Sequence, residues 1–224
     1  MEIFGLSILV LLKLILVDIV LSGDNAVVIA MASRNVPKDL QKKAIFWGTS
    51  GAIVLRLVFA ALIVTLLDLP FIHFIGGILL VWIAINLLTN GEGDHKEGGI
   101  TVWSAVKTII IADAIMSIDN VVALAGVAHG NLFAIIVGVL VSIPIIVFCS
   151  QLILKAMEKF PIISYVGSGI LAWTAGEMIV SEPKLDSVFP HDFHFLIPAA
   201  LTVIAIGVGY LISKMKQRNK KQNH

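Results

Sequence analysis

Residues 17–30 read VDIVLSGDNAVVIA, and residues 112–125 read ADAIMSIDNVVALA. The two stretches are identical at six of fourteen positions, and every charged or amide side chain of the first has its match in the second. Both lie inside long apolar segments, where a carboxylate costs several kcal/mol and is rare unless it has a function. The pair therefore indicates a duplicated membrane unit that contains a polar site.

The composition of the chain is that of a membrane protein. Of its 224 residues, 58% are hydrophobic and 14% are charged, and the mean hydropathy is +0.98. These values exclude an ordinary soluble domain, and a formal net charge of +1 gives no reason to expect nucleic-acid binding. Apolar runs of about 18 residues or more predict seven spans. We place them at 4–32, 44–67, 70–89, 101–127, 131–154, 162–181 and 194–213. The first run lacks a small-residue cleavage site, so we expect it to remain as a span.

The expected architecture is all-α and polytopic, with two three-helix repeats and one extra helix. The repeats occupy residues 1–90 and 101–182, a cytoplasmic linker occupies 91–100, and the seventh helix lies within 183–213. An odd number of spans in each repeat requires the two copies to be inserted in opposite directions. Basic residues follow the first, fifth and seventh spans, including the tail 214–224. The positive-inside rule then predicts a bacterial cell-membrane protein with its N-terminus outside and its C-terminus in the cytoplasm.

The charges inside the predicted spans do not balance. We count four aspartates and Glu177 as embedded, against Arg56 and Lys13, so protons or a bound cation must supply the remaining positive charge. We expect Arg56 to pair with one aspartate. Carboxylate, amide and hydroxyl oxygens favour Mn²⁺, Ca²⁺ or Mg²⁺ over Zn²⁺ or Cu⁺. The predicted metal site consists of Asp18, Asp24, Asn25, Asp113, Asp119 and Asn120, with Ser22, Ser117, Arg56 and Glu177 as supporting residues.

Helical periodicity separates the two aspartates of each motif. At 100° per residue, Asp18, Ser22 and Asn25 form one stripe, and their counterparts in the second copy form another. The second aspartate of each motif lies about 100° off its stripe. It joins the same site only if the helix unwinds after the serine, and Gly23 favours such a break in the first copy.

Enzymatic chemistry is not expected. The sequence contains no nucleophile motif, no phosphate-binding glycine loop and no zinc-protease pattern, and we expect no prosthetic group. His73 lies near a span end, where we expect an interfacial position and no carboxylate partner.

The segments SGDNAVVIA and SIDNVVALAG, each preceded by an aspartate in its span, resemble the paired signature of the TerC family of integral membrane proteins. The resemblance extends over essentially the whole chain, and it is greatest to the small bacterial YjbE-type group. It implies Mn²⁺ efflux from the cytoplasm, kinship with a wider superfamily of cation exporters, and a role in metal supply to secreted enzymes. The six predicted ligands match the family motif.

The leading hypothesis is a secondary exporter that binds Mn²⁺ between the first and fourth spans and alternates access by movement of the two repeats. Its partners would be the lipid bilayer, the divalent cation and protons returning as the counter-ion. Two other hypotheses remain open. One is a membrane adaptor that docks a membrane-protein partner and transports nothing, and the other is a Ca²⁺/proton exchanger.

Overall fold

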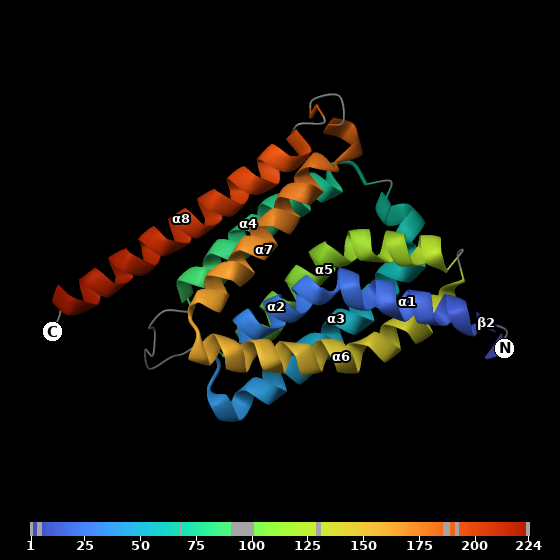
Figure 1. The fold of residues 1–224 in the computed structure, drawn as a ribbon, viewed down its shortest axis with the longest axis horizontal. Helices are drawn as coiled ribbons and strands as arrows, with labels where there is room; N and C mark the ends of the chain where they lie inside the picture. The colour runs from blue at the N-terminus through green and yellow to red at the C-terminus, as the bar shows by residue number, and fades with distance from the viewer. Residues whose placement is uncertain are drawn as a thin grey trace.

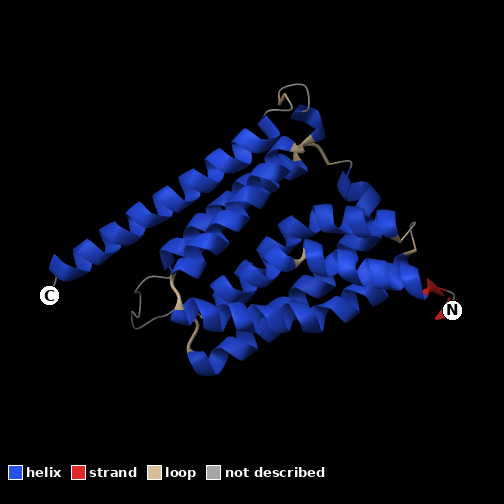
Figure 2. Ribbon diagram, in the orientation of Figure 1, coloured by secondary structure: helices blue, strands red, loops and turns tan. Residues whose placement is uncertain are grey.

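The computed structural model describes residues 2–3, 6–67, 69–90, 101–128, 131–185, 189–190 and 193–222. The expected linker 91–100 lies outside these residues. Within them, strands β1 (Glu2–Ile3) and β2 (Leu6–Ser7) form an antiparallel pair ahead of the first helix. The helices are α1 (Ile8–Leu21), α2 (Gly23–Ser33), α3 (Lys38–Leu67), α4 (Ile72–Asn90), α5 (Val102–Val127), α6 (Leu132–Lys159), α7 (Ile162–Val180), the 3₁₀ turn η1 (Pro183–Leu185) and α8 (Phe193–Gln222). Helices account for nearly all of the described chain (Figure 2).

The all-helical membrane fold expected from the sequence is confirmed. Six helices in the described residues are long and apolar enough to cross a membrane, and α1 with α2 forms a bent pair that passes the same test together. Helix boundaries differ by a few residues from those expected. Helix α3 begins at Lys38, directly after Pro37, and an acidic residue in its first turn favours this earlier start. Helix α8 continues to Gln222, so the basic residues at its end lie on the helix.

The first span is broken where the glycine predicted a break. Helices α1 and α2 meet at Ser22 with a bend of 45°. Ser22 does not cap α2 with its side chain, because its hydroxyl is engaged elsewhere. In α5, Ser117 matches Ser22 and Ile118 matches Gly23, and α5 runs through both positions without interruption. The two copies of the motif therefore differ in backbone shape.

The helices pair across the two halves of the chain. Helix α3 packs along α5, α1 along α6, and α4 along α7, while α2 lies against both α5 and α6. The counterparts in the two halves are α1 and α5, α3 and α6, and α4 and α7. If each helix is replaced by its counterpart, the α3–α5 contact becomes the α1–α6 contact, and the α4–α7 contact stays the same. Helices α1 and α5 run in opposite directions in Figure 1, and α8 packs outside the other helices against α4 and α7. A two-fold inverted repeat produces this pattern, although the boundaries of the repeats stay a prediction.

Glycines allow α4 and α7 to approach each other closely. A Cβ atom on Gly77 would lie 2.6 Å from the carbonyl oxygen of Ala175, so only glycine fits at this crossing. Large apolar side chains such as Val20, Phe148 and Val203 are exposed on the outside of the helices. A bilayer covers such side chains, whereas in water they would form an aggregating surface.

The basic clusters after the first and fifth spans meet at one end of the bundle. Lys38 Nζ at the start of α3 lies 3.5 Å from Glu158 Oε1 near the end of α6. Lys216 Nζ near the end of α8 donates to the carbonyl oxygen of Thr89 at 3.2 Å, and Figure 1 shows the ends of these helices on the same side. The assignment of this side to the cytoplasm stays a prediction.

Candidate functional site

Arg56 lies at the centre of the polar cluster. Its side chain projects from the middle of α3 and is only 5% exposed. The guanidinium Nη2 donates to Asp113 Oδ1 at 2.6 Å, and Nη1 donates to Asp18 Oδ1 at 3.3 Å. We expected Arg56 to pair with one aspartate, and the structure shows that it pairs with two, one from each copy of the motif.

The serines of the two motifs complete the binding of the same guanidinium. Arg56 Nε donates to Ser117 Oγ at 3.1 Å, and Nη1 donates to Ser22 Oγ at 2.9 Å. Each serine in turn donates to the aspartate of its own copy, Ser117 to Asp113 at 3.0 Å and Ser22 to Asp18 at 3.4 Å. Equivalent aspartate and serine residues of the repeat thus face each other and share one arginine.

The two aspartates have different surroundings. Asp18 is fully buried, and its second carboxylate oxygen accepts a hydrogen bond from Ser142 of α6. Asp113 is slightly more open, with 11% of its side chain exposed, and it lines a small cavity. Asp18 is therefore held on every side by the protein, whereas Asp113 can offer an oxygen to a further ligand.

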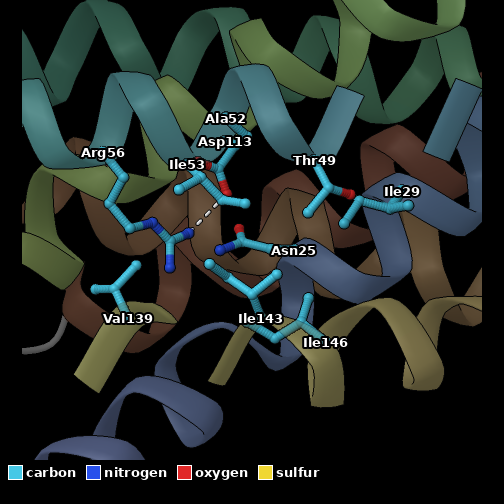
Figure 3. A pocket seen from close by; sticks show the side chains of 10 residues that line it. All are labelled: Asn25, Ile29, Thr49, Ala52, Ile53, Arg56, Asp113, Val139, Ile143 and Ile146. Carbon is cyan, nitrogen blue, oxygen red and sulfur yellow. Dashed lines mark hydrogen bonds and ion pairs between the residues drawn. The ribbon is translucent and has the colours of Figure 1, made fainter. Parts of the chain in front are cut away.

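The cavity beside Asp113 has a volume of about 20 Å³, which is enough for a single water molecule or a small ion. Asn25, Thr49 and Arg56 form its polar wall, and Figure 3 shows these side chains around the same space as Asp113. Both amide atoms of Asn25 and the hydroxyl of Thr49 are buried, and they have no hydrogen-bond partner in the described part of the chain. Buried polar atoms without a partner are costly, so these atoms mark a place where a polar ligand can bind.

The cluster has an excess of negative charge. Asp18 and Asp113 carry two formal charges against the single charge of Arg56, and no other cationic side chain of the described residues forms a salt bridge with either aspartate. Lys13, the other candidate counter-ion, is exposed on α1. The excess charge, together with the open amide and hydroxyl groups, favours a cation as the ligand of the cavity.

The remaining predicted site residues lie around this cluster or away from it. Asp24 accepts a hydrogen bond from the backbone N–H of Asn25 at 2.9 Å, and its other oxygen lies 3.5 Å from Thr174 Oγ1 of α7. Asn120 Nδ2 donates to the carbonyl oxygen of Leu21 at the end of α1, at 3.3 Å. Asn120 therefore connects the second motif to the break in the first span.

Asp119 and Glu177 lie apart from the Arg56 cluster. The Asp119 side chain is 51% exposed and pairs with His73 Nε2 at 2.9 Å. Glu177 is exposed and accepts a hydrogen bond from Trp173 Nε1 at 2.9 Å. The 100° offset derived from the sequence explains Asp119, because α5 does not unwind and its second aspartate points away from the first.

The expectation that His73 has no carboxylate partner was wrong, whereas its interfacial position stays a prediction. Its side chain is buried and lies between two carboxylates, with Nδ1 3.8 Å from Glu182 Oε2 on the side opposite Asp119. Phe71 adopts a positive φ of 61° at the start of α4, and its backbone N–H donates to Glu182 Oε1 at 3.2 Å. This turn brings the start of α4 against the end of α7. Nothing local in the sequence links His73 with Glu182.

A metal site built from side-chain carboxylates and imidazoles alone is not present in the part of the chain that the structure describes. No group of three or more His, Cys, Asp or Glu side chains is placed there to hold one ion. A cation at Asp113 would therefore depend on the amide of Asn25 and the hydroxyl of Thr49, or on a rearrangement that brings further oxygens to it.

The chain matches known membrane proteins over nearly its full length. The sequence profile of the integral membrane protein TerC family matches residues 5–221. The uncharacterized membrane protein YjbE of Bacillus subtilis is 40% identical over 212 residues, which cover 94% of this chain and 96% of that protein. The uncharacterized membrane protein YceF of the same organism is 24% identical, covering 92% of this chain and 82% of that protein. The UPF0053 inner membrane protein YoaE of Escherichia coli is 27% identical, with 92% of this chain but only 42% of that protein covered. No solved structure matches.

Proposed function

We propose that this chain, which belongs to the TerC family of integral membrane proteins, transports divalent metal cations across the membrane, and that Mn²⁺ is the ion it exports. The observation that carries the proposal is the cavity at Asp113. It combines a carboxylate with excess negative charge and a buried amide and hydroxyl that have no partner within the described residues. Ionisable groups in the middle of spanning helices usually mark the path of an ion or a substrate.

The ligand chemistry supports a hard or borderline cation. Asp113, Asn25 and Thr49 supply oxygen atoms, whereas the free thiol of Cys149 and the imidazole of His73 are not among the residues that line the cavity. Oxygen donors of this kind suit Mn²⁺, Mg²⁺ and Ca²⁺. The small volume requires the ion to lose most of its water, which disfavours Mg²⁺ because it dehydrates reluctantly.

The arrangement of the helices supports alternating access. The cavity is lined by α2 and α3 of the first half and by α5 and α6 of the second half, and the first span bends at Ser22, close in sequence to Asn25 of the cavity wall. In transporters with inverted repeats, the substrate lies at the repeat interface and the halves move around it. Protons would be the returning ions, since the four motif aspartates and Glu177 can carry them.

Flux measurements in sealed vesicles test the proposal. Purified protein reconstituted into liposomes that contain a Mn²⁺-quenched dye should transport Mn²⁺, and Asp113→Asn should abolish the flux. Asp39→Asn is the matched control, because Asp39 is an exposed aspartate in the first turn of α3, and it should leave the flux unchanged. Competition by Ca²⁺ in the same vesicles separates Mn²⁺ export from Ca²⁺/proton exchange.

Absence of flux for every divalent cation would contradict transport and would favour the membrane adaptor. In the adaptor, the Arg56 ion pairs would serve only to hold the helices together. In cells, loss of transport should appear as manganese accumulation and sensitivity to added manganese. Unchanged cellular manganese in an Asp113→Asn strain would argue against export.

A further inference from the structure

We propose that Arg56 is a tethered counter-ion that occupies the two carboxylates while the site is empty and is displaced from them when the divalent cation enters. The proposal rests on the transport function above and adds a residue that sets the affinity of the site. Four hydrogen bonds place the guanidinium between Asp18 and Asp113. It thus takes the position that a shared cation would take between two aspartates of a repeat.

The charge of the cluster supports an exchange of cations. With Arg56 in place the cluster carries one negative charge, and a divalent cation added beside the guanidinium would reverse it to one positive charge. If the divalent cation instead replaces the guanidinium, the two carboxylates are exactly balanced. Because uncompensated charge is costly in a buried site, the neutral arrangement is the favoured one when the displaced guanidinium turns out of the site towards water or lipid headgroups.

The geometry places the two cations in competition for the same atoms. Asp113 both accepts the 2.6 Å hydrogen bond from Arg56 and lines the cavity with Asn25 and Thr49. Arg56 itself forms part of the cavity wall (Figure 3). An ion bound by Asp113 would therefore touch the guanidinium, and repulsion between them would drive Arg56 away.

This competition gives Arg56 a function in the transport cycle. A site that binds its ion too tightly cannot release it, and a positive side chain that returns to the carboxylates favours release. The asymmetry of the repeat is consistent with this role. The arginine comes only from α3, whereas α6, the corresponding helix of the second half, contributes the hydroxyl of Ser142.

Metal affinity of Arg56→Gln provides the test. Calorimetry on the purified protein in detergent measures the affinity for Mn²⁺. Arg56→Gln should bind Mn²⁺ more tightly than the wild type, by about tenfold or more. Removal of a positive charge in contact with a carboxylate raises the affinity of that carboxylate for cations by at least this factor. Mn²⁺ flux in vesicles should at the same time become slower. Arg56→Lys, which keeps the charge but loses the planar fork, should bind with intermediate affinity.

A purely structural Arg56 predicts the opposite result. If its loss only damages the cluster, Arg56→Gln will bind Mn²⁺ equally or more weakly, and this outcome overturns the proposal. If Arg56→Gln does not fold in metal-free buffer, Mn²⁺ present throughout purification should restore a monodisperse protein, and failure of that rescue also overturns the proposal. Failure of transport as a function is distinguishable, because it would abolish the flux of the wild-type protein itself.

Discussion

Replacement of Arg56 by methionine tests the charge balance of the buried cluster. The substitution keeps a long, flexible side chain but removes the only cation that forms a salt bridge with Asp18 and Asp113 among the described residues. Two carboxylates would then remain close together in a bundle where Asp18 is fully buried. Arg56→Met should therefore destabilise the fold much more than an ordinary surface change.

The expected magnitude follows from the burial of both partners. Removing one member of a buried ion pair costs about 3–5 kcal/mol, because the remaining charge has no counter-ion. The Lys38 and Glu158 side chains, by contrast, are 83% and 38% exposed, and such a surface pair contributes at most about 1 kcal/mol. Lys38→Met is therefore the matched control, and it should change the free energy of unfolding by no more than that amount.

The assay is denaturant unfolding in detergent micelles, in a buffer free of divalent cations so that no metal replaces the missing arginine. The triple variant Arg56→Met, Asp18→Asn, Asp113→Asn removes all three charges together. It should recover to within about 2 kcal/mol of the wild type, since neutral replacement of a whole buried ion cluster is often tolerated.

Two results would refute this reasoning. Stability of Arg56→Met within about 1 kcal/mol of the wild type would mean that the carboxylates do not depend on the guanidinium. A triple variant as unstable as the single variant would mean that the loss comes from packing and hydrogen bonds and not from unbalanced charge.

Three further predictions follow from the packing and the polar contacts. Gly77→Ala should lower the free energy of unfolding by about 1–3 kcal/mol in a thermal unfolding assay, because the added methyl group overpacks the helix crossing. Gly207→Ala is the control, because nothing lies within 4 Å of its added Cβ. It should be neutral or stabilising by up to about 1 kcal/mol in the same assay. His73→Ala should destabilise by about 1–3 kcal/mol, because Asp119 and the buried Glu182 lose the imidazole that lies between them; an unchanged melting temperature would contradict the buried bridge. A cysteine placed at Lys38 or at Glu158 should react with a membrane-impermeant thiol reagent only from the cytoplasmic side, because both native side chains lie at the same end of the bundle; labelling from the opposite side would contradict the orientation.

Sequence periodicity was sufficient to predict the fold class and part of the candidate site. Hydropathy predicted the six helices of the described residues that are long and apolar enough to cross a membrane, and the bent pair α1–α2 that passes the same test together. Each membrane helix must satisfy its own backbone hydrogen bonds and must be apolar over most of its length. Gly23 predicted the break that the structure has at Ser22. The 100° rule placed Asp18 and Ser22 on one face and separated them from the second aspartate of the motif, because these relations depend only on the geometry of a single helix.

Sequence periodicity could not predict the contacts between helices. Arg56 was expected to have one aspartate partner, and its contact with both aspartates depends on α3 packing along α5 and on α1 contacting the same helix. The bridge from His73 to Asp119 and Glu182 joins three segments far apart in the chain. The cavity beside Asn25 and Thr49 likewise exists only because α2, α3, α5 and α6 surround it.

The amino-acid sequence alone thus determined that the chain is a helical membrane protein with a duplicated, acidic motif, since the cost of polar groups in hydrocarbon acts on each span separately. Tertiary packing decided which acids share a counter-ion, which acid faces a cavity and which lies outside the cluster. Those properties depend on the rotation and crossing of whole helices. The local sequence around a side chain does not indicate which residue of another helix it will contact.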